Sequence, residues 1–412
     1  MHITRLSLTN FRNYGRLELD LPLGPSLIHG SNAQGKTNLL EAIYYLATSR
    51  SPHADQDQQL INWVAMQREE PVIVGRLVAQ IVTAAGEHSV EIRLIYERSQ
   101  SIRQERGTFR REALVDKRKV RLMDLLGNLR VVLFLPEDVQ LVTGPPSKRR
   151  RYMDITLCQI DALYCRHLSN YNKVLEQRNA LLRQVAEGSG SRDLLAVYTE
   201  KLVGLGAQIF TRRTRFIAEL AREVHRIHYE DLTEGRETVR LNYWPGLWRS
   251  SADANGGVGE PAWLGWWQEH GQDETAVSAK LHESLETSLA ADLARGATTV
   301  GPHRDDWQFL LNGRSLSSFG SRGQQRTAIL ALKMAEINWM TRQTGETPIL
   351  LLDEVVAELD AQRRALLLNT VQHAHQAFLT ATDPAMFSRD FLRNATGFLV
   401  ENGRVQLDVS QS

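Results

Sequence analysis

The segment Gly30-Ser31-Asn32-Ala33-Gln34-Gly35-Lys36-Thr37 has the pattern G-x-x-x-x-G-K-T, which is typical of a loop that holds nucleotide phosphates. The apolar residues 25–29 before it predict a strand, and residues 37–46 after it predict a helix with one apolar side. Glycines let main-chain N–H groups turn toward a phosphate, and the helix N-terminus adds the positive end of its dipole. All eight residues are therefore predicted to bind ATP. Lys36 is expected to act on the β- and γ-phosphates and Thr37 to take a place on Mg²⁺.

Composition limits the classes of protein that fit the chain. Its 412 residues suggest two or three domains, and 49 Lys and Arg against 48 Asp and Glu leave a net charge of +1. Any DNA-binding surface must therefore come from local clusters of charge. The two cysteines, Cys158 and Cys165, exclude a disulfide scaffold and argue against a structural zinc; their spacing predicts one helix face. We expect a cytoplasmic protein with no membrane partner, because neither a leader pattern nor a long apolar run is present.

The hydrophobic period changes twice along the chain. Period-2 and continuous apolar stretches predict strands at four places before Pro145: 17–21, 72–78, 90–96 and 131–135. Helical stripes then run through 168–185 and 195–227, and the short Gly/Ser segment 187–191 between them predicts a helical hairpin. Strand and helix patterns return near residue 297, at 307–311, 330–340 and 348–352. The interrupted order predicts an α/β ATPase head formed by residues 1–145 and 293–412, with an inserted helical arm domain at 146–292.

A second acidic motif completes the predicted nucleotide site. The apolar residues 349–352 lead into Asp353 and Glu354, which is typical of the strand that follows the phosphate loop in P-loop ATPases. Asp353 is expected to hold the Mg²⁺ ion through its waters, and Glu354 to act as the catalytic residue that polarises the attacking water. Lys36 is the second predicted catalytic residue. Asp360 fits the loop that follows such a strand.

The segment Ser321 to Arg326 indicates the class of ATPase. Ser321, Gly323 and Gln324 stand at the start of a predicted helix, where a hydroxyl and main-chain N–H groups form a second phosphate site. This layout is that of an ABC-type signature, in which the second site faces the ATP of a partner subunit. The pattern therefore predicts a homodimer that closes over ATP.

Seven segments, spread over almost the whole chain, match the motifs of one family of ATPases and occur in the same order as in that family. They are Asn10-Phe11-Arg12-Asn13-Tyr14, Gly30 to Asn38, Leu135-Pro136-Glu137-Asp138, Lys148-Arg149-Arg150-Arg151, Gly301-Pro302-His303-Arg304-Asp305-Asp306, Ser321 to Arg326, and Asp353-Glu354. On these segments the chain resembles the RecF family of bacterial recombinational-repair ATPases, which are related to SMC-type heads. The resemblance implies an ABC-type (SMC-like) fold and an ATP-dependent homodimer on DNA at single-strand gaps. It also implies RecR- and RecO-type mediators, a RecA-type recombinase, and weak, DNA-stimulated ATP hydrolysis.

Some segments depart from the family pattern. Residues 244–272, rich in Trp and Gly, look like an insertion; their tryptophans predict either local packing or base stacking on single-stranded DNA. Residues 51–56 are less basic than expected. The predicted strand 378–382 ends in threonines where many ABC ATPases have a switch histidine, which favours slow hydrolysis. Glu137 or Gln140 is the candidate Q-loop residue.

Three basic clusters are candidate DNA contacts. Residues 103–121 carry eight positive and three negative side chains, residues 148–151 are four successive cations, and Arg212, Arg213 and Arg215 interrupt a helical stripe. Together they predict a one-sided basic surface that neutralises phosphates with little sequence specificity.

Three other interpretations stay open at this point. A nucleotide-binding subunit of a membrane transporter would need neither the helical insert nor the clustered arginines. A structural SMC-like chromosome ATPase would need longer arms. A small-molecule kinase would share the phosphate loop but would have no use for the Ser321 segment.

Overall fold

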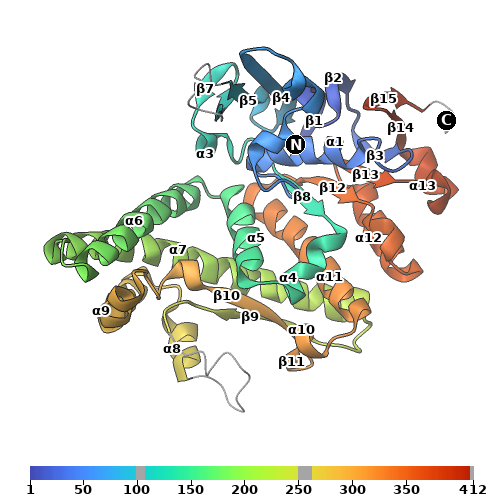
Figure 1. Ribbon diagram of the computed structural model, residues 1–412. Coiled ribbons are helices and arrows are strands. Elements are labelled where there is room, and N and C mark those ends of the chain that lie inside the picture. The colour runs from blue at the N-terminus through green and yellow to red at the C-terminus, as the bar shows by residue number, and fades with distance from the viewer. Residues whose placement is uncertain (99–106, 249–261, 409–412) are drawn as a thin grey trace. The chain divides into compact units, whose positions relative to one another are not determined.

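The computed structural model describes residues 1–98, 107–248 and 262–408 of the chain (Figure 1). The chain divides into two compact units, one formed by Met1–Asp138 with Lys333–Ser412 and the other by Val139–Leu332. The second unit begins before the predicted insert (146–292) and ends well after it, so it also contains the segment with Ser321.

A six-stranded antiparallel sheet forms one layer of the first unit, in the order β2-β1-β4-β5-β6-β7. Its strands are β1 (His2–Phe11), β2 (Tyr14–Asp20), β4 (Val72–Thr83), β5 (Gly86–Glu97), β6 (Thr108–Val115) and β7 (Arg118–Val120). The predicted alternation is confirmed in β2, where Leu17 and Leu19 are buried and Glu18 and Asp20 are exposed. A period of two places such residues on opposite faces, so one face of this sheet is apolar.

A second six-stranded sheet carries the phosphate loop, in the order β15-β14-β3-β13-β12-β8. Its strands are β3 (Gly24–His29), β8 (Val131–Phe134), β12 (Ile349–Asp353), β13 (Gln376–Ala381), β14 (Thr396–Glu401) and β15 (Arg404–Leu407). All neighbouring pairs are parallel except the β14–β15 hairpin. The strands β12 and β13 are buried throughout, as expected for a parallel sheet covered on both faces.

Helix α1 (Lys36–Thr48) packs between these two sheets (Figure 1). Its Leu39, Leu40 and Ile43 belong to one apolar core together with residues of both sheets, such as Leu6 and Phe398. The other helices of this unit are α2 (Trp63–Gln67), α3 (Leu122–Leu125), α12 (Ala361–His373) and α13 (Arg389–Asn394). Because α1 follows the phosphate loop directly, this core fixes the direction in which the loop enters the helix.

The second unit is mainly helical. Its helices are α4 (Gln140–Thr143), α5 (Pro146–Cys158), α6 (Ala162–Ala186), α7 (Arg192–Arg226), α8 (Ala262–His270), α9 (Glu274–Arg295) and α10 (Leu316–Phe319). Helices α6 and α7 form the predicted hairpin, and α9 packs along both of them as a third helix that the sequence analysis did not predict. Helix α11 (Arg322–Thr344) begins in this unit and ends in the first.

A small three-stranded sheet completes the second unit, in the order β11-β10-β9. The hairpin of β10 (Asp306–Leu311) and β11 (Arg314–Ser315) turns at Asn312-Gly313, as predicted, and β9 (Val239–Trp244) pairs antiparallel with β10. Cys158 lies at the end of α5 and Cys165 lies in α6, so the prediction that they share one helix face is wrong. A turn at residues 159–161 separates the two helices.

Candidate nucleotide-binding site

The phosphate loop joins the end of β3 to the start of α1, as the sequence predicts. Gly30 and Gly35 have φ values of 138° and 119°, which L side chains rarely adopt. A Cβ atom at Gly30 would collide with the main-chain oxygen of Val400, and one at Gly35 would collide with the side chain of Asn13. Both glycines are therefore required by backbone conformation and by close packing.

Lys36 is buried and its ammonium group lies among oxygen atoms. Nζ donates hydrogen bonds to the main-chain oxygens of Gly30 (2.9 Å) and Ser31 (3.1 Å), and it lies 3.4 Å from Oε1 of Glu354. The lysine is 4% exposed. The predicted phosphate-binding cation and the predicted catalytic carboxylate thus lie next to one another.

Thr37 and Asp353 meet at the carboxyl ends of β3 and β12. The Thr37 hydroxyl donates to Oδ1 of Asp353 at 3.0 Å, and the Thr380 hydroxyl donates to the same oxygen at 2.7 Å. Burial raises the pKa of Asp353, and the two hydroxyl donors oppose that rise. The structure therefore places together the two residues predicted to serve Mg²⁺.

Thr380 also holds the second acid of the motif. Its Oγ1 accepts a hydrogen bond from the main-chain N–H of Glu354 at 2.9 Å. Glu354 has a φ of 53°, a left-handed conformation that is unusual for a residue with a long side chain. Such strain is frequent at functional sites, where neighbouring contacts maintain it. Thr380 is a site residue that the sequence analysis missed, although its threonine-ended strand was singled out.

The turn between β1 and β2 supports the loop from one side. Asn13 Nδ2 donates to the main-chain oxygen of Gln34 (2.7 Å), and its Oδ1 accepts from Asn38 Nδ2 (2.8 Å). The Tyr14 hydroxyl donates to the main-chain oxygen of Gly35 at 2.9 Å. The motif Asn10 to Tyr14, quoted above only for its resemblance, is thus a direct support of the phosphate loop.

Asp360 caps a helix instead of meeting the loop residues described above. It is the N-cap of α12, and its carboxylate accepts a hydrogen bond from the N–H of Arg363 at 3.0 Å. That hydrogen bond, followed by the nearby Arg363 charge, lowers the pKa of Asp360. The predicted nucleotide-binding role of Asp360 stays a prediction.

Ser321, Gly323 and Gln324 stand at the start of α11, as predicted. Ser321 Oγ accepts from the N–H of Gln324 (3.2 Å), and Gln324 Oε1 accepts from the N–H of Ser321 (2.8 Å). This reciprocal capping box fixes the helix start. Gln324 Nε2 also donates to Glu237 at 2.7 Å. These residues belong to the second unit and the phosphate loop to the first, so their action on ATP stays a prediction.

Several arginines predicted to contact DNA are structural. Arg149 is buried and forms a two-point ion pair with Asp306, with N–O distances of 2.6 and 2.9 Å. Arg213, 2% exposed, pairs with Asp305 at 2.6 Å and with Asp154 at 2.7 Å. Their prediction as DNA contacts is wrong. A run of basic residues in the sequence does not reveal which of them have carboxylate partners in the fold.

Other cations of those clusters are also engaged. Arg150 donates to the main-chain oxygen of Asp305 at 2.6 Å, and Arg212 pairs with Asp161 at 2.9 Å. Arg103 and Arg106 lie outside the described residues. In the cluster 103–121, Arg110, Arg111 and Lys119 have acidic partners, whereas Lys117, Arg118 and Arg121 are exposed cations of the β6–β7 hairpin and its exit.

The segment Gly301 to Asp306 organises the second unit. Asp305 is buried; Oδ2 accepts hydrogen bonds from the Tyr243 hydroxyl (2.5 Å) and Arg213 (2.6 Å), and Oδ1 accepts from the N–H of Gly246 (2.7 Å). Burial raises the pKa of Asp305 to about 6, against the opposing effect of Arg213. This segment therefore joins α7 to β9 and β10, so its family-specific sequence has a structural role.

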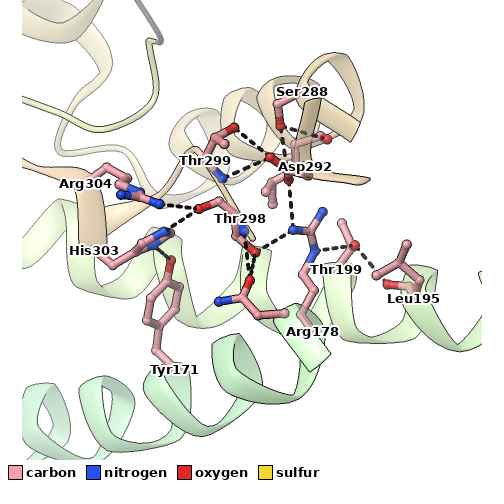
Figure 2. A network of polar contacts seen from close by, with 12 residues as sticks. Tyr171, Arg178, Leu195, Thr199, Ser288, Asp292, Thr298, Thr299, His303 and Arg304 are labelled. Atoms are coloured by element: carbon pink, nitrogen blue, oxygen red, sulfur yellow. Dashed lines mark hydrogen bonds and ion pairs between the residues drawn. The ribbon is translucent and has the colours of Figure 1, made fainter. Parts of the chain in front are cut away.

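The same segment is tied to the helical arm through His303 (Figure 2). His303 Nε2 lies 3.0 Å from the main-chain oxygen of Thr298, which can only accept, so Nε2 carries the proton. Nδ1 then accepts from the Tyr171 hydroxyl at 2.7 Å. Burial lowers the pKa of His303 to about 4. Farther along, Arg178 of α6 and Asp292 of α9 form a fully buried ion pair at 3.0 Å.

The tryptophans of the 244–272 segment favour the packing interpretation. Trp263 and Trp267 are 8% and 5% exposed, and Trp248 stacks on Trp263 with ring centroids 5.4 Å apart. Buried indoles packed on one another have no free face for a base. The Gly/Ser-rich residues 250–259 lie outside the described residues. Across the described ranges, no helix has the length and apolar character needed to cross a bilayer.

Comparisons with known proteins agree with this geometry. The family model "RecF/RecN/SMC N terminal domain" matches residues 2–405. "DNA replication and repair protein RecF" of Chloroflexus aurantiacus is 40% identical over 98% of this chain and 99% of its own, and the protein of the same name from Symbiobacterium thermophilum is 38% identical over 99% of both chains.

Solved structures give the same result. A structure titled "Structure of the recombination mediator protein RecF-ATP in RecFOR pathway" has a TM-score of 0.81 and 31% identity, covering 99% of this chain and 98% of the other. An SMC head bound to the C-winged helix domain of ScpA, at 14% identity and a TM-score of 0.50, shares the fold. The predicted α/β ABC-type, SMC-like fold is confirmed, and the chain belongs to the RecF family of DNA replication and repair ATPases.

Proposed function

We propose that the chain is an ATP-dependent DNA clamp of recombinational repair, which closes as a homodimer on DNA at single-strand gaps. The observation that carries the proposal is the arrangement at the carboxyl ends of β3 and β12. There the Thr37 hydroxyl lies 3.0 Å from Asp353 Oδ1, and Lys36 Nζ lies 3.4 Å from Glu354 Oε1. A glycine loop, a lysine, a hydroxyl and two carboxylates in this order are the parts that ATP hydrolysis requires.

The oxygen atoms of Thr37 and Asp353 fit Mg²⁺. This ion prefers oxygen ligands, and with nucleotides it is typically held by one or two protein oxygens, waters and phosphates. When bound, it would neutralise charge on the phosphates. The Thr380 hydroxyl donates to the Asp353 oxygen that faces Thr37 and so holds this oxygen in place. Thr380 also accepts from the N–H of Glu354 and so holds the main chain that carries the Glu354 carboxylate.

Lys36 and Glu354 have separate roles in hydrolysis. Lys36 moves from the main-chain oxygens of Gly30 and Ser31 to the β- and γ-phosphates, because phosphate oxygens carry more negative charge. Glu354 then accepts a proton from the water that attacks the γ-phosphate. The turnover is slow and DNA-stimulated in this proposal. The strand β13 supplies Thr380 beside the two acids, and its end at Ala381 is followed by Thr382 in place of a switch histidine.

The ATP-bound dimer uses the start of α11. Ser321, Gly323 and Gln324 of one subunit cover the γ-phosphate of ATP bound to the other, and Asp360 lies at the same interface in the proposed dimer. The capping box at Ser321 supports this role, because it presents a hydroxyl and a helix N-terminus on exposed residues.

Duplex DNA next to a gap is the proposed partner of the first unit. Within the first unit, the exposed cations Lys117, Arg118 and Arg121 are the candidate contacts of the predicted basic surface. Contacts of this kind neutralise phosphates and do not read bases, so little sequence preference is expected. RecR- and RecO-type mediators and a RecA-type recombinase are the proposed protein partners, as the RecFOR pathway named for the solved relatives suggests.

A structural SMC-like chromosome ATPase is the competing function. Helix α7, the longest of the arm, has 35 residues, which corresponds to about 50 Å at 1.5 Å per residue. An arm of that length is too short to bridge distant DNA segments, which favours the repair clamp.

The proposal is tested by binding of fluorescent ATP to the wild-type protein and to Lys36→Ala, followed by binding of both proteins to gapped duplex DNA. We expect ATP binding by the wild type alone, and ATP-dependent DNA binding that the variant lacks. Wild-type protein without ATP affinity, or DNA binding equal with and without ATP, would contradict it.

A further inference from the structure

The turn between β14 and β15 contacts the phosphate loop directly. The N–H of Asn402 donates to Oε1 of Gln34 at 2.7 Å, and the N–H of Gly403 donates to the main-chain oxygen of Gln34 at 3.2 Å. Asn13 donates to that same main-chain oxygen from the β1–β2 turn. Gln34, the residue before the second glycine of the loop, is therefore held by two separate turns.

Gly403 is required by this contact as well as by its own turn. Asn402 and Gly403 have φ values of 49° and 70°, the left-handed pair of a two-residue hairpin turn. A Cβ atom at Gly403 would lie 2.7 Å from the main-chain oxygen of Asn13. The turn Asn312-Gly313 has nearly the same angles, 49° and 79°, but a Cβ atom at Gly313 would meet nothing within 4 Å.

The same hairpin contacts the other end of the loop. The main-chain oxygen of Val400 fills the space where Gly30 would carry a Cβ atom. Just before the loop, His29 Nε2 lies 2.9 Å from Oδ2 of Asp408, the residue that follows β15. The β14–β15 hairpin thus flanks the phosphate loop from the residue that precedes it to the residue before its second glycine.

We propose that the β14–β15 hairpin is a positioning element of the nucleotide site, and that Gln34 and Gly403 are positioning residues for ATP binding. The inference rests on the proposed function, because it assigns these residues a role in the same ATP site. Gln34 acts through its contacts with the hairpin and Gly403 through close packing on the β1–β2 turn.

The physical reason is preorganisation of the loop. Its main-chain N–H groups bind phosphate only when they all point inward, and residues 31–34 have no helix or strand hydrogen bonds to keep them so. Contacts that hold the loop before ATP arrives reduce the ordering cost of binding. Loss of one such contact should weaken ATP binding by about threefold to tenfold.

The test compares Gly403→Ala with Gly313→Ala. Both substitutions place a methyl group at a left-handed turn position, but only the first disturbs the loop. We expect Gly403→Ala to raise the Kd for fluorescent ATP about tenfold. Gly313→Ala should bind ATP as the wild type does, although it carries the same left-handed backbone strain and also loses thermal stability without nucleotide. Faster amide hydrogen exchange at residues 31–36 should accompany the change in Gly403→Ala alone.

A second variant removes the contact from the side of the loop. Gln34→Met keeps the length of the side chain but cannot accept from Asn402, and we expect about threefold weaker ATP binding. The double variant should lose less affinity than the product of the two single losses, because both substitutions loosen the same β14–β15 turn from the phosphate loop. If Gly403→Ala does not fold, Gln34→Met and the exchange rates of its loop decide the question.

The outcomes separate this inference from the proposed function. Wild-type protein that binds no ATP contradicts both. If the wild-type protein binds ATP and both Gly403→Ala and Gln34→Met bind it equally well, the positioning role is overturned and the proposed function is left intact.

Discussion

Replacement of Arg178 by Met should destabilise the second unit strongly, because it leaves a buried carboxylate without its cation. Arg178 and Asp292 are both 0% exposed, and the guanidinium is the positive partner at 3.0 Å (Figure 2). Asp292 would keep only neutral donors, among them the N–H and hydroxyl of Thr299 at 3.0 and 2.6 Å. Breaking a buried pair by removal of one partner typically costs about 3–5 kcal/mol of unfolding free energy.

Urea unfolding followed by tryptophan fluorescence suits this test. Six of the eight tryptophans lie in the second unit, so the signal reports mainly on that unit. Lys280→Met is the matched control, because it removes a solvent-exposed pair with Glu283 on α9 and should cost less than about 1 kcal/mol. Arg178→Met/Asp292→Leu should recover part of the loss. A cost for Arg178→Met no greater than that of the control would refute the reasoning.

Three further predictions concern pH, hydrolysis and DNA. The pKa of His303 is about 4 in the fold and near 6.5 when unfolded, so neutral His303 contributes stability that is present above pH 6.5 and lost as the pH falls toward 4. The difference in urea midpoint between the wild type and His303→Gln should therefore shrink between pH 6.5 and pH 4. A difference that stays constant over this range would contradict the assignment. Thr380→Val should slow ATP hydrolysis about 10- to 100-fold by releasing Asp353 and Glu354. The control Thr382→Val, at an exposed position just past β13, should hydrolyse ATP at the wild-type rate. If Thr380→Val releases phosphate as fast as the wild type, Thr380 has no role in the site. Replacement of Lys117, Arg118 and Arg121 together by alanine should flatten the slope of log affinity for DNA against log salt by about 0.9 per lost phosphate contact. Arg110→Ala should change the slope less, because the Arg110 guanidinium is already paired with Glu97 and Glu112. An unchanged slope in the triple variant would place the DNA site elsewhere.

Local patterns in the sequence were enough to predict the nucleotide loop and several strands of the head. The loop residues, the apolar strand before Asp353 and the alternation in β2 are each specified by neighbouring residues, and the structure has these elements where they were predicted. Strand β9 and helix α9 were missed because they are stabilised by distant segments, β10 and the α6–α7 hairpin.

Long-range pairing also explains the wrong predictions. Arg149 and Arg213 look like parts of basic runs until their carboxylate partners, Asp306 and Asp305, are brought to them from more than 90 residues away. Thr380 was noted only as a departure from a family pattern, because its role depends on the strand order that sets it beside Asp353. Contacts of this kind leave no periodic signal in the sequence.

Sedimentation velocity of the full chain with ATP and gapped duplex DNA tests the central claim most directly. The account predicts a monomer without nucleotide, a dimer with ATP, and a faster-sedimenting dimer–DNA complex when gapped DNA is added. Ser321→Arg should bind ATP but stay monomeric, whereas Ser189→Arg, which adds the same charge at the turn between α6 and α7, should dimerise normally. A Ser321→Arg protein that dimerises with ATP as the wild type does would contradict the account.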